Sequence, residues 1–147
     1  FRLENPRVFP SERFPKITAM ENSLVTQRQV EWTDLDSYEH VNNVIYVNYA
    51  EEAAAEDFAA RGWSPVKLAE AGLSVITKRV HVQYLSIAAW GETLNISTHL
   101  LDVKETGGSR YVSMTRADGT TVAECILDWE LVDRQSGEVR SLPNELR

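Results

Sequence analysis

The spacing of apolar residues changes along the chain and divides it into a strand, a helical region and a run of strands. Residues 23–32 mix apolar with polar positions, which indicates a strand. Residues 44–61 contain no glycine or proline and six alanines, so we expect a long helix that Gly62 ends and Asn42 or Asn43 caps. A proline at position 65 and a glycine at position 72 bracket a short second helix over 65–71.

After Gly72 the apolar residues alternate, which predicts four strands over 73–85, 93–103, 110–115 and 121–132. The breaks between them are Gly91, Gly107-Gly108 and Asp118-Gly119. Consecutive strands with short turns predict an antiparallel meander. A helix of about 18 residues is about 27 Å long and matches these strands, so it is best buried by a sheet curled around it. The predicted fold class is α+β, with about five strands.

Composition narrows the possible functions. The chain of 147 residues suits a single domain over 23–147, preceded by an irregular arm over 1–22 that carries three prolines. Its net charge of -7 argues against general nucleic-acid binding, and no apolar run reaches the length of a membrane span. The single cysteine, Cys125, excludes an intrachain disulfide and fits a reducing compartment, so we expect a cytoplasmic protein. Three scattered histidines predict no metal site.

The segment 32–46 gathers polar residues immediately before the long helix. It contains two aspartates, Asp34 and Asp36, together with His40, Asn42 and Asn43. The first turn of a helix presents unpaired amides with partial positive charge, which stabilise a developing oxyanion. A carboxylate held beside them can attack a carbonyl or activate a water molecule.

The same residues also have structural explanations. Asp34 and Asp36 can bond to their own loop backbone, and the asparagines can serve as helix caps. A single loop histidine such as His40 is more often packed than catalytic. Taken alone, the residues of this loop favour the structural interpretation.

The wider pattern resembles the hotdog-fold thioesterases, in particular the 4-hydroxybenzoyl-CoA thioesterase and acyl-carrier-protein (ACP) thioesterase branches. The resemblance covers most of residues 23–146. It is carried by Asp34-Leu35-Asp36, His40-Val41-Asn42-Asn43, Tyr46, Tyr49, Glu52, Tyr84, Gly91-Glu92-Thr93-Leu94 and Arg140-Ser141-Leu142-Pro143. It implies a hotdog fold, in which a curved antiparallel sheet wraps a central helix, and an acyl thioester hydrolase.

The resemblance also implies roles for individual residues. The catalytic carboxylate of the family falls on Asp36, and in the ACP branch His40 contributes as well. The amides that polarise the thioester carbonyl fall on four residues at the helix start, namely Asn43, Val44, Ile45 and Tyr46. The ACP-branch pattern is not complete, because Tyr38 replaces its asparagine and Ile87 occupies the position of its glutamate.

Thioester hydrolysis makes modest chemical demands. An aspartate with an ordinary pKa of about 3.9 is ionised at neutral pH, and a thiol of pKa about 8.5 leaves without much help from an acid. One carboxylate, one water and an oxyanion site are therefore enough, and we expect no cofactor. Whether Asp36 attacks directly or activates water stays open.

Several further residues have a functional and a structural interpretation. Glu51 and Glu52 lie on the helix and could supply a base, but solvation explains them more simply. Buried packing is the favoured explanation for Cys125, and hydrogen-bonded or exposed side chains are the default for His81 and His99. Trp63 and Trp90 could line an acyl channel, but packing explains them more simply. Lys78, Arg79, Lys104 and Arg110 could bind the phosphates of CoA or an acidic carrier protein, which a net-negative chain would need, or could simply be solvated.

A sheet wrapped on one helix leaves an edge strand and an outer face uncovered, so self-association is expected. The resemblance implies a homodimer or a homotetramer acting on acyl-CoA or acyl-ACP. Two alternative functions remain open. One is a hydratase or dehydratase on the same fold, and the other is a non-catalytic module that binds acyl thioesters.

Overall fold

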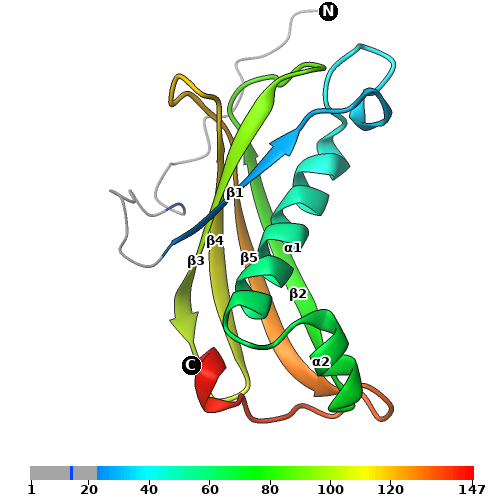
Figure 1. The fold of residues 1–147 in the computed structure, drawn as a ribbon, viewed down its shortest axis with the longest axis vertical. Coiled ribbons are helices and arrows are strands. Elements are labelled where there is room, and N and C mark those ends of the chain that lie inside the picture. Colours follow the sequence, from blue (N-terminus) through cyan, green and yellow to red (C-terminus); the bar gives the residue numbers. More distant parts are fainter. Residues whose placement is uncertain (1–13, 15–22) are drawn as a thin grey trace, which may run out of the picture.

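The fold is a five-stranded antiparallel sheet that packs one face against a long helix (Figure 1). The computed structural model describes Phe14 and residues 23–147, so the arm expected over 1–22 lies almost entirely outside the described residues. The main elements are β1 (Leu24–Gln29), η2 (Trp32–Asp34), α1 (Asn43–Ala60), α2 (Pro65–Glu70), β2 (Leu73–Tyr84), β3 (Thr93–Val103), β4 (Gly107–Thr115), β5 (Thr121–Asp133) and η3 (Asn144–Leu146). The predicted sheet around a long helix is confirmed.

Helix α1 (Asn43–Ala60) begins and ends within one residue of the predicted limits, 44–61. The side chain of Asn42 accepts a hydrogen bond from the amide of Val44, and Gly62 follows the helix with a φ of 86°. That left-handed conformation favours glycine. The buried residues of α1 are Tyr46, Tyr49, Ala50, Ala53, Ala54, Asp57 and Phe58. The small alanines let the helix lie close to the sheet.

The strand order β1-β3-β4-β5-β2 corrects the predicted four-strand meander. Strands β3, β4 and β5 do form consecutive antiparallel pairs, but β2 pairs with β5 at the far side of the sheet, and β1 pairs with β3. Residues 85–92 therefore connect β2 to β3 across the end of the sheet instead of forming a hairpin. Alternation identifies a strand and its faces but not its neighbour.

Gly107 and Gly108, which we expected to lie in the turn between two strands, are the first residues of β4. A Cβ added to Gly107 would lie 2.1 Å from the carbonyl oxygen of Trp129, and one added to Gly108 would lie 2.1 Å from that of Asp102. These glycines are needed for close contact between backbones, and the turn itself lies just before them.

Strand β2 contains a β-bulge, which the alternating pattern of the sequence did not reveal. Its register with β5 shifts between Thr77 and Arg79, so Lys78 is an extra residue. As a result, Ile76 pairs with Glu130 whereas Val80 pairs with Leu127, and these two apolar residues of β2 face opposite sides of the sheet. The other edge of β2 has no strand partner within the described residues.

Candidate active site

Asp36 lies at the tip of a small hairpin that leads into α1. The amide of Asn42 donates to the carbonyl of Asp34 (2.9 Å), Leu35 and Val41 form an antiparallel bridge, and the amide of Asp36 donates to the carbonyl of His40 (2.8 Å). Asp36 is therefore two residues along the strand, about 7 Å, from the pair of Asp34 and Asn42, and Asn42 is the cap of α1. This hairpin therefore connects the acid to the start of α1 through a short stretch of hydrogen-bonded backbone.

The carboxylate of Asp36 is fixed on one side only. Its Oδ1 accepts hydrogen bonds from the amides of Tyr38 (2.8 Å) and His40 (3.2 Å). Its Oδ2 has no hydrogen-bond partner among the described residues. The residue is half-buried. Two amide donors thus set the orientation of the carboxylate, and one oxygen is left for water or substrate.

The start of α1 has fewer available amides than the resemblance implied. The amide of Val44 donates to the side chain of Asn42 (3.2 Å), and the amide of Ile45 donates to the carbonyl of Asn42 (2.9 Å). The amide of Asn43 meets no acceptor among the described residues, as is usual for the first residue of a helix. Asn43 is therefore the member of the expected set that is best placed to donate to a carbonyl oxygen.

Two tyrosines and the β2–β3 connection form the wall next to this helix start. The hydroxyl of Tyr84 donates to the carbonyl of Asn43 (3.0 Å), and the rings of Tyr84 and Tyr46 meet edge to face with centroids 5.5 Å apart. Burial raises the pKa of Tyr46, and the negative charge of Asp36 contributes in the same direction. Asp36 thus lies within electrostatic range of the first turn of α1.

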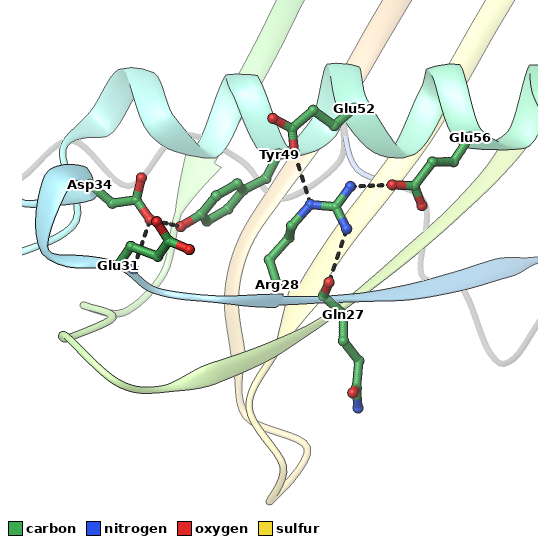
Figure 2. Close-up of polar contacts among 7 residues, drawn as sticks. All are labelled: Gln27, Arg28, Glu31, Asp34, Tyr49, Glu52 and Glu56. Atoms are coloured by element: carbon green, nitrogen blue, oxygen red, sulfur yellow. Dashed lines mark hydrogen bonds and ion pairs between the residues drawn. The ribbon is translucent and has the colours of Figure 1, made fainter. Parts of the chain in front are cut away.

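Asp34 has a structural role that the sequence left open. Its Oδ2 accepts a hydrogen bond from the hydroxyl of Tyr49 (2.6 Å) and another from the amide of Glu31 (2.9 Å), as Figure 2 shows. It also forms the capping box of η2 together with Glu31. Asp34 therefore ties the loop to α1, whereas the neighbouring acid, Asp36, keeps a free oxygen.

The glutamates of α1 differ in what they contact. Figure 2 shows Arg28 of β1 between Glu52, at 2.8 Å from Nε, and Glu56. Glu52 therefore belongs to an ion-pair network between strand and helix. Glu51 lies on another face of α1 and lines a cavity. His40 contributes its backbone to the hairpin, but its ring is exposed and makes no hydrogen bond within the described residues.

Arg110 cannot bind a surface phosphate, which corrects our expectation. Its side chain is 0% exposed and donates to Asp57 (2.8 Å) and to Thr98 (2.9 Å) on the helix side of the sheet. Burial lowers the pKa of Arg110, and the charge of Asp57 opposes this effect. Lys78 and Arg79 are exposed and lie 3.8 Å from Glu130 and 3.4 Å from Asp128, so these two stay candidates for phosphate binding.

The remaining candidates have mostly structural positions. Cys125 is buried, and its burial raises the pKa of its thiol to about 12, which argues against a nucleophile. His99 is buried against Tyr111, and His81 is half-buried and its side chain makes no hydrogen bond within the described residues. Trp90 is exposed and contacts Trp32, whereas Trp63 lines the cavity. No cluster of metal-ligating side chains occurs among the described residues.

A cavity of about 320 Å³ lies between the second half of α1 and strands β2 and β5. Its walls are largely apolar and include Ala54, Ala55, Phe58, Trp63, Leu68 and Trp129. Val44, Val47 and Glu51 lie on the same face of α1 as Ala54 and Phe58, because residues three or four apart share one side of a helix. This helix face connects the start of α1 to the cavity.

Comparisons with known proteins identify the family. The model of the thioesterase-like superfamily matches residues 30–147. The chain belongs to this superfamily. It is therefore a hotdog-fold thioesterase, a hydrolase of thioesters. The long-chain acyl-CoA thioesterase FadM of Escherichia coli is 24% identical over 129 residues, covering 84% of this chain and 94% of FadM.

Solved structures share the hotdog fold at low identity. A Staphylococcus aureus protein, solved in complex with CoA, has a TM-score of 0.80 and 14% identity, with 88% of this chain and 82% of that chain covered. The 1,4-dihydroxy-2-naphthoyl-CoA thioesterase from Synechocystis has a TM-score of 0.78 and 13% identity, with 84% and 92% covered. Within the described residues, no helix is long and apolar enough to cross a membrane.

Sequence reasoning missed two residues that hold the start of α1 in the candidate active site, Ala88 and Arg116. Ala88 bonds to both sides of the helix start, and Arg116 binds the connection that contains Ala88. A signal was present, because Glu92 directly precedes β3 and Arg116 directly follows β4. Their ion pair becomes predictable only after β3 and β4 are known to be antiparallel neighbours.

Proposed function

We propose that this thioesterase hydrolyses acyl-CoA or acyl-ACP thioesters with Asp36 as the nucleophile or general base. The observation that carries this proposal is the fixed Asp36 carboxylate, with one oxygen free, on the hairpin that leads directly to the available amide of Asn43. The amide polarises the thioester carbonyl. The acid either attacks the carbonyl carbon, giving a mixed anhydride that water later hydrolyses, or takes a proton from a water molecule that attacks the carbon instead. The bond between the carbonyl carbon and sulfur then breaks, and sulfur leaves as thiolate. His40 is a candidate for a supporting role from the same hairpin.

The acyl group is proposed to follow α1 into the cavity. From Asn43 to Glu51 the helix rises about 12 Å, and to Phe58 about 22 Å. A bilayer hydrocarbon core of about 30 Å holds two leaflets, so one long acyl chain extends about 15 Å. A chain whose carbonyl lies at Asn43 would therefore end near Ala54 and Ala55, about 16–18 Å along the helix and at the Glu51 end of the cavity. The name of FadM supports the same class, a long-chain acyl-CoA.

The decisive experiment measures free thiol released from a panel of acyl-CoA and acyl-ACP substrates by wild type and Asp36→Asn. We expect the variant to lose about 10²–10⁴ in rate, as for removal of a general base. Asp102→Asn, an exposed acid on β3, is the matched control and should retain the wild-type rate. Equal rates for wild type and Asp36→Asn would remove Asp36 from the mechanism. Tight binding without thiol release would indicate a binding module, and products formed without thiol would indicate a hydratase.

We also propose that the chain forms a homodimer through β2, in which both active sites lie near the contact. The free edge of β2 and the exposed apolar residues Ile76, Val80 and Tyr84 support this assembly. Light scattering should give twice the chain mass of 16.6 kDa, or four times for a tetramer. Val80→Lys should lower this mass, and a wild-type monomer at micromolar concentration would contradict the proposal.

A further inference from the structure

Arg116, immediately after β4, holds the connection between β2 and β3. Its guanidinium donates to Glu92 (2.6 Å from Nε), to the hydroxyl of Ser86 and to the carbonyl of Ile87. The second oxygen of Glu92 accepts from the amide of Ala89 (2.6 Å). The hydrogen bond to Arg116 lowers the pKa of Glu92, so this carboxylate stays ionised at neutral pH. The arginine and the glutamate thus fix the connection at four points.

The residue at the centre of this connection binds both sides of the candidate active site. Ala88 is fully buried. Its carbonyl accepts from the amide of Val41 (3.2 Å), directly before the helix cap. Its amide donates to the hydroxyl of Tyr46 (3.3 Å), on the first turns of α1. A shift of Ala88 would therefore move the Asp36 hairpin relative to the start of α1.

We propose that Arg116 is a positioning residue for thioester hydrolysis, acting through Ala88 on the Asp36 hairpin and on Tyr46. This inference rests on the proposed function, because it assigns to Arg116 the alignment of that same site. The physical reason is geometric. A misplacement of about 1 Å between reacting groups can cost about 10²-fold in rate even when the altered residue lies away from the chemistry. A planar fork that bonds three partners at once suits this task better than a single charge.

The first test compares Arg116→Gln and Arg116→Lys with a matched control, Arg140→Gln. Arg140 also pairs with a carboxylate, Asp133 at 3.2 Å, but it lies on the segment after β5. We expect Arg116→Gln to lower kcat about 10- to 10²-fold with a smaller change in KM. Lys at position 116 can keep the pair with Glu92 but not the fork, so it should restore kcat in part. Arg140→Gln should keep the wild-type kcat.

A double-mutant cycle with Tyr46→Phe separates positioning from simple stabilisation. Removing the Tyr46 hydroxyl removes the acceptor of the Ala88 amide. If Arg116 acts through this contact, the losses in kcat should not be additive, and Arg116→Gln/Tyr46→Phe should resemble the more impaired single variant. Hydrogen exchange of the peptide spanning 84–92 should increase in Arg116→Gln at a temperature where thermal melts show full folding.

Three outcomes would overturn the inference, and they separate its failure from the failure of the proposed function. If Asp36→Asn is impaired but folded Arg116→Gln keeps the wild-type kcat, or if the cycle is additive, Arg116 does not position the site and the proposed function stands. If the wild type releases no thiol from any thioester of the panel, the proposed function fails, and the role of Arg116 fails with it.

Discussion

The hydroxyl of Tyr49 donates a 2.6 Å hydrogen bond to the carboxylate of Asp34, and this contact gives the two aspartates of the loop different roles. Burial, followed by the bond to Asp34, raises the pKa of Tyr49 above its ordinary value, so the phenol remains a donor at neutral pH. The carboxylate of Asp34 has a structural role, because it binds the Tyr49 hydroxyl and the Glu31 amide. Asp36, two residues later, uses one oxygen for the loop and keeps the other available.

Tyr49→Phe should therefore lower stability without abolishing the reaction. Loss of a hydrogen bond to a charged group costs about 1.5–3 kcal/mol, which chemical denaturation can measure. Thiol release per folded molecule should stay within a few-fold of wild type, in contrast to Asp36→Asn. Tyr38→Phe is the control, because Tyr38 is exposed and its hydroxyl makes no hydrogen bond within the described residues. A loss of rate in Tyr49→Phe as large as that in Asp36→Asn would refute the division of roles.

Three residues, Gly62, Asp36 and Arg110, show how much of the structure could be predicted from the sequence. Gly62 and the alanines fixed the limits of α1 because helix propensity and capping are local. Asp36 could be placed before a helix start for the same reason. Arg110 could not be placed, because its burial depends on Asp57, a partner 53 residues away in the chain. Alternation likewise marked β2 as a strand, but the choice of β5 as its neighbour depends on contacts across the whole sheet.

Glu39 should be a site where substitution stabilises the chain. It adopts a φ of 62° and is the only non-glycine residue with positive φ among the described residues. It occupies the third position of the loop between Asp36 and His40, where a left-handed conformation is usual and glycine is preferred. Glu39→Gly should raise stability by about 1 kcal/mol, seen as a higher thermal midpoint. Ser37→Gly, in the same loop but without positive φ, should lower it; equal shifts in both variants would contradict the argument.

Breaking the buried pair of Asp57 and Arg110 should be costly. Arg110→Met leaves an acid that is 4% exposed with only its partly exposed neighbour Arg61, at 2.9 Å. Loss of one partner of a buried ion pair costs about 3–5 kcal/mol, whereas replacing both by apolar residues is often neutral. Asp57→Leu/Arg110→Met should thus unfold at a higher denaturant concentration than Arg110→Met. The double variant should also keep the wild-type ratio of the KM for acyl-CoA to the KM for acyl-pantetheine. If only the KM for acyl-CoA rose, Arg110 would bind a phosphate of CoA after all.

Asp133 should contribute to stability in a pH-dependent way. Hydrogen bonds from the amide of Ser136, from Arg140 and from the amide of Gln135 lower its pKa to about 2. The unfolded value is about 3.9, so the folded state binds this proton more weakly. The contribution is complete above the unfolded pKa and is lost as pH falls through the folded pKa. The thermal midpoints of wild type and Asp133→Asn should therefore differ at about pH 6 and converge toward about pH 2. A difference that does not change with pH would exclude this origin.

Ala55 should limit the length of the acyl chain that the cavity accepts. Its methyl group lines the wall opposite β2 and β5, so Ala55→Leu fills space that the end of a long chain would occupy. Selectivity for a methylene in an apolar pocket is about 10- to 200-fold, so kcat/KM should fall for long chains while short chains keep theirs. Ala60→Leu, at the exposed end of α1, is the control.

Because Trp63 and Trp129 line the cavity, binding of a long-chain fatty acid should also change the tryptophan fluorescence of the wild type, and should change that of Ala55→Leu less. An unchanged chain-length profile would mean that the acyl group lies elsewhere, even if Asp36 proves essential.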